Sequence, residues 1–147
     1  MLRVPLHQLD PELAVPAYAR PGDAGADLVA RHDALLAARG GRALMPTGVA
    51  VAIPTGYAGL VLPRSGLALR HGVTCLNTPG LIDAGYRGEL QVILVNHDPA
   101  ADYTVSRGDR IAQLVIVGVE EAAFALVSHE GLGAATRGAG GFGHTGT

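Results

Sequence analysis

Short runs of apolar residues alternate with polar turn residues along most of the chain. The runs at 49–53, 57–62 and 90–96 are rich in β-branched residues, and each is followed closely by a proline or an aspartate. Residues 111–119 form the most apolar stretch. Strands separated by turn residues at intervals of roughly 8–12 residues are typical of all-β domains. The pattern therefore predicts an all-β sandwich or barrel.

Three segments depart from this strand pattern. Residues 33–41 have helical propensity and end in glycine, but an isolated helix of this length is marginal, and we favour a strand or loop. A short helical turn is expected at 65–71. Residues 131–147 contain seven glycines and only two large apolar side chains, so they cannot form a core. We therefore expect a β domain at 1–130 and a flexible C-terminal arm at 131–147.

Composition narrows the chemistry that the chain can perform. The 147 residues fit one domain, and the net charge of −2 argues against general binding of nucleic acid. The sequence has no lysine and one cysteine, which excludes a lysine-bearing phosphate loop, an intrachain disulfide and a C-x-x-C zinc or redox site. All 11 basic side chains are arginines. Their planar guanidinium groups are suited to phosphate oxygens.

The N-terminal residues do not resemble a signal peptide, because they carry Asp10 and Glu12 and lack a long apolar core. No apolar run approaches ~18 residues, the length that a membrane-spanning helix needs. We therefore expect a cytoplasmic protein whose partners include neither a membrane nor nucleic acid.

Two segments contain residue types suited to binding an anion and to accepting a proton from water. Residues 63–67 combine a guanidinium, a hydroxyl and a glycine that permits close backbone approach, which together suit an anion. In residues 77–89, Asp83 lies between Ile82 and small residues and is a candidate general base, a role worth roughly 10²–10⁴-fold in rate. Strands flank residues 77–89, so we expect a hairpin whose backbone groups read the edge of a flat base.

Three further segments complete the set. Gln113 lies on the strand face opposite its apolar neighbours, just after a Gly-Asp turn. Asp27, at the entry to a strand, is a candidate for hydrated Mg²⁺, which often contacts protein through one carboxylate. Residues 137–146 resemble a glycine-rich phosphate loop without the usual strand and helix around it. Taken singly, each segment also fits an ordinary turn, cap, edge strand or frayed terminus.

The order of these five segments resembles the five ordered motifs of the trimeric dUTPases. The matching stretches are Ala24-Gly25-Ala26-Asp27-Leu28, Pro63-Arg64-Ser65-Gly66-Leu67-Ala68, Gly80-Leu81-Ile82-Asp83-Ala84-Gly85-Tyr86-Arg87-Gly88-Glu89, Gly108-Asp109-Arg110-Ile111-Ala112-Gln113-Leu114 and Arg137-Gly138-Ala139-Gly140-Gly141-Phe142-Gly143. The resemblance extends from about residue 20 to the C-terminus, and the second and third motifs are highly specific. It implies a jelly-roll-like β-barrel and a homotrimer whose active sites lie between subunits, with the C-terminal arm closing over one of them.

The resemblance also implies the reaction, which is hydrolysis of dUTP to dUMP and pyrophosphate with Mg²⁺ on the triphosphate. This reaction limits uracil incorporation into DNA and supplies dUMP for thymidylate synthesis. Asp83 resembles the residue that orients and deprotonates the water attacking the α-phosphorus, and Asp27 resembles the acidic residue near the hydrated metal.

The remaining expected site residues follow from the same resemblance. Those that resemble the phosphate-contacting set are Arg64, Ser65, Gly66 and Gln113. Those that resemble the uracil-reading segment are Asn77, Gly80, Leu81, Ile82 and Tyr86, the last of which excludes a ribose 2′-hydroxyl. Those in the arm are Arg137, Phe142 and Gly143, of which Arg137 clamps the phosphates and Phe142 stacks on the base.

Three positions depart from the family pattern. Ala139 stands where the family often has a hydroxyl or acidic residue. His144 stands where a serine is common, and Leu81 where a threonine is common. The alternatives are a dCTP deaminase or bifunctional deaminase–dUTPase of the same fold, a non-enzymatic trimeric binding module, and a broader nucleoside triphosphate pyrophosphatase. Tyr86 and the second and fifth motifs favour the pure dUTPase, and a binding module would not need Asp83 together with Arg137.

Overall fold

The computed structural model describes residues 1–136, 138 and 139. Within these residues the chain forms ten strands, a seven-residue α-helix and a 3₁₀ turn. The elements are β1 (Leu6–Gln8), β2 (Ala26–Val29), β3 (Ala34–Leu36), β4 (Arg42–Val51), β5 (Tyr57–Pro63), α1 (Ser65–His71), β6 (Val73–Cys75), β7 (Gly80–Ile82), β8 (Glu89–Asn96), β9 (Tyr103–Val105), β10 (Arg110–Gly118) and η1 (Glu130–Leu132).

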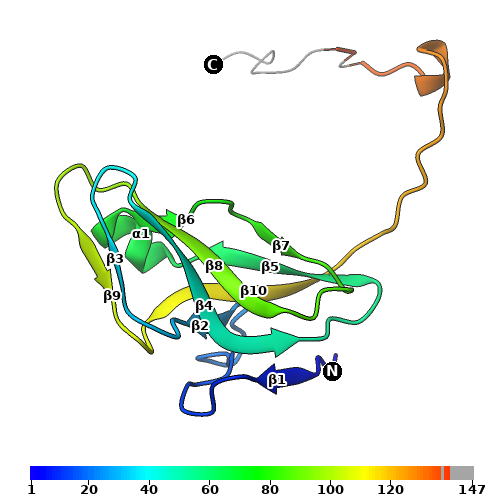
Figure 1. Cartoon of the computed structure of the whole chain (residues 1–147). Coiled ribbons are helices and arrows are strands. Elements are labelled where there is room, and N and C mark those ends of the chain that lie inside the picture. Colours follow the sequence, from blue (N-terminus) through cyan, green and yellow to red (C-terminus); the bar gives the residue numbers. More distant parts are fainter. Residues whose placement is uncertain (137, 140–147) are drawn as a thin grey trace.

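Two four-stranded antiparallel sheets make up the body of the molecule (Figure 1). Their strand orders are β1-β4-β8-β6 and β2-β10-β5-β7, and β3 pairs with β9 in a separate two-stranded sheet. The all-β, jelly-roll-like prediction is confirmed, but the expectation of a barrel is wrong, because no strand pairing within the described residues joins the two large sheets. The four outer strands are only three or four residues long, and such short edge strands limit further pairing.

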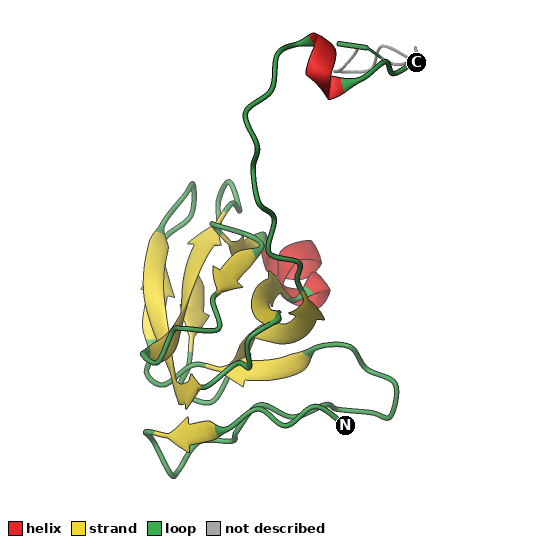
Figure 2. Cartoon of the chain, turned by 90° about the vertical axis from the view of Figure 1, so that its right-hand side faces the viewer, coloured by secondary structure: helices red, strands yellow, loops and turns green. Residues whose placement is uncertain are grey.

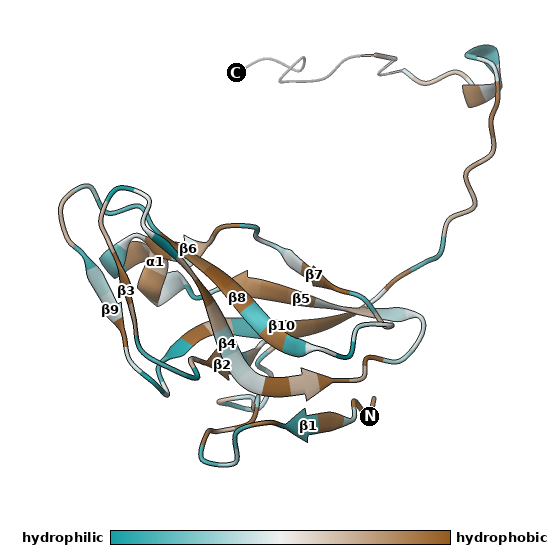
Figure 3. Cartoon of the chain, in the orientation of Figure 1, coloured by the Kyte–Doolittle hydropathy of each residue, from teal (hydrophilic) through white to brown (hydrophobic). Residues whose placement is uncertain are grey.

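The core lies between the two sheets and is built by the alternating pattern of the long strands. In β8, Leu90, Val92 and Leu94 are almost fully buried, whereas Gln91 between them is exposed. Each buried side chain of this size contributes about 1.5–3 kcal/mol. Figure 3 shows hydrophobic residues concentrated along the central strands and hydrophilic residues in the connecting loops. Most residues of the apolar runs that predicted strands therefore lie in strands that pack this core.

The predicted helical turn is present as α1, which directly follows β5 (Figure 1). The helix ends at Gly72, whose φ of 64° lies in the left-handed region that favours glycine and whose N–H donates to the carbonyl of Ala68. Leu67 is the buried residue that anchors the helix on the core, and the ring of His71 lies 4.8 Å from that of Tyr103. Packing against the body therefore holds a helix too short to be stable alone.

The strand or loop that we favoured for residues 33–41 is also confirmed, since β3 occupies residues 34–36 and pairs with β9. Residues 77–89 are more complex than a simple hairpin. The strands on either side of them, β6 and β8, pair antiparallel as a hairpin requires. The connection between them contains β7, however, which pairs with β5 in the opposite sheet. Residues 77–89 therefore reach from one sheet to the other.

After β10 the chain leaves the two sheets and extends to η1, as Figure 2 shows. The last strand ends at Gly118, and the domain boundary expected between residues 130 and 131 stays a prediction. Its apolar side chains Phe124, Leu126 and Leu132 are exposed, Phe124 at 98%. In the part of the chain that the structure describes, no helix is both long enough and apolar enough to cross a bilayer.

An ion-pair network fastens the N-terminal segment to the sheets. Asp10 accepts hydrogen bonds from Arg107 at 2.6 and 3.0 Å and from Arg31 at 3.4 Å. Arg31 also pairs with Glu89 at 3.2 Å, and Glu89 accepts a hydrogen bond from the backbone N–H of Gly48. The hydrogen bonds from Arg107 are the main reason that the pKa of Asp10 is lowered from 3.8 to about 2.

The lowered pKa predicts a pH-dependent contribution of Asp10 to stability. Because the folded-state pKa lies below the unfolded value, the contribution is complete above pH 3.8 and is lost as the pH falls through about 2. We expect Asp10→Asn to lower the melting temperature by a few degrees at pH 7. The difference from wild type should shrink between pH 3.8 and about 2 in a calorimetric series.

Glu121→Gln is the control, because it removes one exposed carboxylate for which the described structure shows no ion pair. A melting-temperature difference for Asp10→Asn that stays constant down to pH 2 would show that packing, rather than charge, accounts for the effect.

Candidate active site

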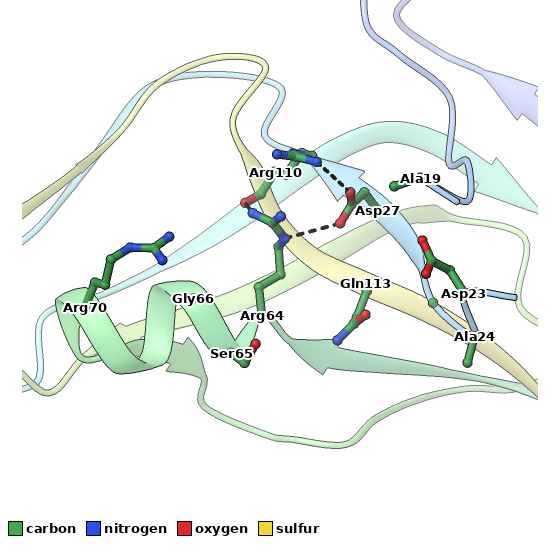
Figure 4. A pocket seen from close by; sticks show the side chains of 11 residues that line it. Ala19, Asp23, Ala24, Asp27, Arg64, Ser65, Gly66, Arg70, Arg110 and Gln113 are labelled. Carbon is green, nitrogen blue, oxygen red and sulfur yellow. Dashed lines mark hydrogen bonds and ion pairs between the residues drawn. The ribbon is translucent and has the colours of Figure 1, made fainter. Parts of the chain in front are cut away.

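A polar pocket of ≈ 370 Å³ lies where β2, the end of β5, the start of α1 and β10 meet (Figure 4). Most of its lining comes from three of the five segments singled out in the sequence. The lining residues are Ala19, Asp23, Ala24, Gly25, Asp27, Arg64, Ser65, Gly66, Arg70, Arg110 and Gln113. Three guanidinium groups and two carboxylates line this pocket, so the lining carries a net charge of about +1 at neutral pH.

Asp27 joins two of these arginines into one cluster, which we call the Asp27 cluster. One carboxylate oxygen lies 3.2 Å from Nε of Arg64, and the other lies 3.2 Å from Nη1 of Arg110 (Figure 4). Arg64 also donates from Nη1 to the backbone carbonyl of Arg110 at 3.1 Å. The side chains of Asp27 and Arg64 are about three-quarters buried, which reduces solvent screening of their attraction. The cluster therefore holds two positive charges side by side with one negative charge between them.

A β-bulge in β10 brings Arg110 to the pocket. Gln113 lies opposite Asp27 in the sheet register, so both side chains are on the same face. Residues 110 and 113 would face opposite sides of a regular strand, because side chains alternate. The register shifts between Arg110 and Ala112, and both Ile111 and Ala112 are buried. The bulge thus allows Arg110 and Gln113 to face the same pocket.

Gln113 is held by a hydrogen bond, and its amide occupies the space beside Gly25. Its Nε2 donates to the carbonyl of Pro63 at 3.0 Å, which ties β10 to the end of β5. A Cβ placed on Gly25 would collide with Oε1 of Gln113 and lie 3.0 Å from its Cδ. Gly25 therefore leaves the space that the Gln113 amide occupies. The neighbouring Ser65 presents its exposed hydroxyl at the start of α1.

Asp83 lies outside the polar pocket. It follows β7, is exposed, and lines a second pocket of ≈ 350 Å³. The other residues of this Asp83 pocket are Thr55, Gly56, Tyr57, Ala58, Ala84, Val119, Glu120 and Glu121. The backbone carbonyl of Asp83 accepts a hydrogen bond from the N–H of Tyr86 in a tight turn. The guanidinium of Arg87 donates to the backbone carbonyls of Ala84 and Tyr86. The Tyr86 hydroxyl donates to the carbonyl of Glu89 at 2.9 Å, so the turn is held at both ends.

The structure thus brings some of the expected site residues together and leaves others apart. Those that share the polar pocket are Asp27, Arg64, Ser65, Gly66 and Gln113. Those carried by residues 77–89, outside the polar pocket, are Asn77, Gly80, Leu81, Ile82, Asp83 and Tyr86. Those that lie outside the described residues are Arg137, Phe142 and Gly143.

Two arginines of the polar pocket, Arg70 and Arg110, were not among the expected site residues. Arg110 was part of a quoted motif, but its direction depends on the bulge, which leaves no pattern in a single sequence. The sequence did contain a signal that could have placed Arg70 in the site, because Arg70 falls four residues after Gly66 in a predicted helical turn. Residues four apart lie on the same face of a helix.

The pocket also offers a carboxylate to a metal ion. Among the described residues, no group of three or more His, Cys, Asp or Glu side chains could hold a metal ion. Asp27 has used one acceptor position on each oxygen for an arginine, and a carboxylate can accept roughly four hydrogen bonds. It therefore retains positions for water molecules of a hydrated Mg²⁺, which keeps several waters when bound to protein and phosphate.

The fold and the pocket define a class of protein, an all-β sandwich with a polar pocket that is lined by three arginines and two aspartates. The dUTPase family model matches residues 12–146, and the chain belongs to the dUTPase family. It is 58% identical to the deoxyuridine 5′-triphosphate nucleotidohydrolase of Thermobifida fusca, across 99% of this chain and 79% of that protein. It is 52% identical to that of Nocardia farcinica, across 97% of this chain and 85% of the relative. The chain is therefore an enzyme of this family.

Solved structures agree with this assignment. The dUTPase of Staphylococcus bacteriophage 80alpha with dUPNHPP superimposes with a TM-score of 0.89 at 28% identity, covering 100% of both chains. A mutant dUTPase from phage phi11 of S. aureus, described with a structural Mg(II) ion, has a TM-score of 0.79 at 27% identity. That match covers 88% of this chain and 99% of the phage protein.

The contact between Gly25 and Gln113 predicts a substitution that damages the site more than the fold. A methyl group at Gly25 must displace the flexible end of Gln113, so we expect Gly25→Ala to lower kcat/KM for dUTP by about tenfold, equivalent to roughly 1.4 kcal/mol. The melting temperature should change little. Steady-state kinetics and thermal denaturation measure both effects.

Gly118→Ala is the matched control, because a Cβ at Gly118, also in β10, meets no atom within 4 Å. Wild-type kinetics in Gly25→Ala would show that the position of the Gln113 amide does not matter for turnover.

Proposed function

We propose that this chain hydrolyses dUTP to dUMP and pyrophosphate by attack of water on the α-phosphorus, with Mg²⁺ on the triphosphate. The observation that carries the proposal is the polar pocket, in which Arg64, Ser65, Gly66 and Gln113 come together from separate segments beside Asp27. Membership of the dUTPase family supplies the substrate class. One support rests on geometry and the other on sequence similarity.

The pocket is suited to a triphosphate because its donors are held in place before the ligand arrives. Asp27 fixes the guanidinium of Arg64, and the carbonyl of Pro63 fixes the amide of Gln113. Donors that need no reorganisation stabilise developing negative charge most effectively. When bound, Mg²⁺ would neutralise further charge on the phosphate oxygens, and Asp27 would hold it through water.

Asp83 is proposed as the general base. It is exposed at the end of β7, and the bonds made by Arg87 and Tyr86 hold the turn that carries it. A carboxylate held in this way can orient a water molecule and accept its proton as the oxygen attacks phosphorus. The proton is transferred to Asp83, and the α–β bridging oxygen leaves with pyrophosphate.

The uracil ring is proposed to bind along β7. This strand lies at the edge of its sheet, so the backbone groups on its outer side have no strand partner within the described residues. Such groups can form hydrogen bonds that distinguish uracil from cytosine, whose donors and acceptors differ. Asn77 lies beside the strand, since its Nδ2 is 3.4 Å from the position of a Cβ on Gly80. Tyr86 would exclude the 2′-hydroxyl of a ribonucleotide.

We propose that the active enzyme is a homotrimer with sites shared between subunits. Two observations support an assembly. Asp83 and the polar pocket occupy separate places on one chain, so another copy can bring the two halves together. The segment after Gly118 also exposes Phe124 and Leu126 away from the sheets, where a neighbouring chain can cover them. A molar mass other than that of three chains in light scattering would contradict this proposal.

The arm is proposed to complete each site, with Arg137 binding the phosphates and Phe142 stacking on the base, next to Gly143. Cytoplasmic localisation is proposed because the substrate belongs to the deoxynucleotide pool.

A substrate panel tests the function. With Mg²⁺ present, we expect release of pyrophosphate from dUTP and far slower release from UTP, dTTP and dCTP, measured by a coupled phosphate assay. Comparable turnover of dCTP with formation of ammonia would instead assign the chain to the deaminases of this fold. Similar turnover of all four nucleotides would assign it to the broader pyrophosphatases.

Asp83→Asn tests the mechanism separately from binding. We expect turnover to fall by roughly 10²–10⁴-fold, because the amide cannot accept the proton. Binding of the imido analogue dUpNHpp, measured by calorimetry, should stay close to that of wild type. Asp102→Asn is a control with the same chemical change, in the loop before β9. Near-normal turnover in Asp83→Asn would remove this residue from the role of base.

A further inference from the structure

The polar pocket contains one arginine that has no partner among the described residues. Arg64 and Arg110 both pair with Asp27, whereas Arg70 forms no ion pair or side-chain hydrogen bond with any residue that the structure describes. In Figure 4 its guanidinium extends from α1 on the same side as the other two and carries no dashed line. Arg70 therefore brings a positive charge to the pocket that no carboxylate of the described chain neutralises.

The position of this charge is set by α1. Arg70 is in the last turn of α1, and Gly66 is in the first, four residues earlier. A Cβ on Gly66 would lie only 2.8 Å from Nη2 and 3.2 Å from Nη1 of Arg70. The guanidinium therefore folds back along the helix over Gly66, toward Arg64 and Ser65. Any side chain at Gly66 would occupy the space that Arg70 uses.

The base of the Arg70 side chain is fixed although its tip is exposed. Leu67 buries one face of α1 in the core, and the adjacent His71 packs against Tyr103. Gly72 then ends the helix with its N–H bonded to Ala68. Rotation of α1 would break these contacts, so Arg70 stays beside the pocket while its guanidinium remains free to meet a ligand.

We propose that Arg70 is a substrate-binding residue that contacts the terminal phosphates of the triphosphate, the part that leaves as pyrophosphate. This inference rests on the proposed function, because it assumes that the polar pocket binds the triphosphate. A free guanidinium matches two phosphate oxygens with its planar fork, and charge-assisted bonds of this kind are the strong ones. Arg70 then favours the triphosphate over the monophosphate product, because dUMP lacks the groups that it contacts.

The test compares Arg70→Gln with wild type. We expect KM for dUTP and the inhibition constant of inorganic pyrophosphate each to rise about tenfold, whereas the dissociation constant of dUMP changes less than about twofold. Arg70→Lys should recover part of the loss, since it keeps the charge without the planar fork. Arg42→Gln is the control, because Arg42 is exposed in β4, has no ion pair in the described structure and lies outside the pocket.

The outcomes separate this inference from the proposed function. Unchanged constants for dUTP and pyrophosphate in Arg70→Gln, with a wild type that hydrolyses dUTP, overturn the role of Arg70 alone. Equal weakening of dUTP and dUMP also overturns it, because Arg70 would then act on the nucleoside or on the shape of the pocket. A wild type that does not hydrolyse dUTP overturns the proposed function, and pyrophosphate binding measured by calorimetry still tests Arg70.

Discussion

The antiparallel pairing of β10 with both β2 and β5 is the constraint on which the polar pocket depends. β10 occupies an interior position of its sheet, and its register places Gln113 opposite Asp27 on one side and opposite Leu62 on the other. Three segments that are far apart in the sequence therefore lie side by side in one sheet. Because side chains alternate along a strand, a shift of one residue in this register would turn Gln113 into the core and remove the pocket.

On this frame, the Asp27 cluster solves an electrostatic problem. Two guanidinium groups that converge on one ligand repel each other when the ligand is absent. Asp27 lies between Arg64 and Arg110 at 3.2 Å from each and compensates half of their charge. The arginines can then keep a fixed geometry in the free protein, which lowers the entropic cost of ordering them when phosphate binds. Arg70 lies outside this arrangement and adds charge without a partner in the described chain.

Much of this architecture could be predicted from the sequence, because the signals for strands and turns come from residues that are close together along the chain. Apolar runs bounded by proline and aspartate mark strands because a paired strand buries alternate side chains, and β5, β8 and β10 lie where these runs predicted them. The helical turn at 65–71 was also predictable from short-range signals. Residues 34–36 form a strand although the segment 33–41 has helical propensity, because pairing with β9 outweighs that local preference. The five motifs identified the family, because their residue types and order are specific together even though each motif alone also fits an ordinary turn.

By itself, the amino-acid sequence determined the all-β class, the family and five residues of the polar pocket. The tertiary structure decided the properties that depend on which strands pair and in what register. It showed an open sandwich rather than a barrel, because the short edge strands of the two large sheets do not pair with each other. It also showed that a bulge turns Arg110 into the pocket, that Arg70 folds back over Gly66, and that β7 carries Asp83 to a separate surface. A pattern of residues along a chain records which faces are buried, but only pairing between distant segments fixes which side chains meet.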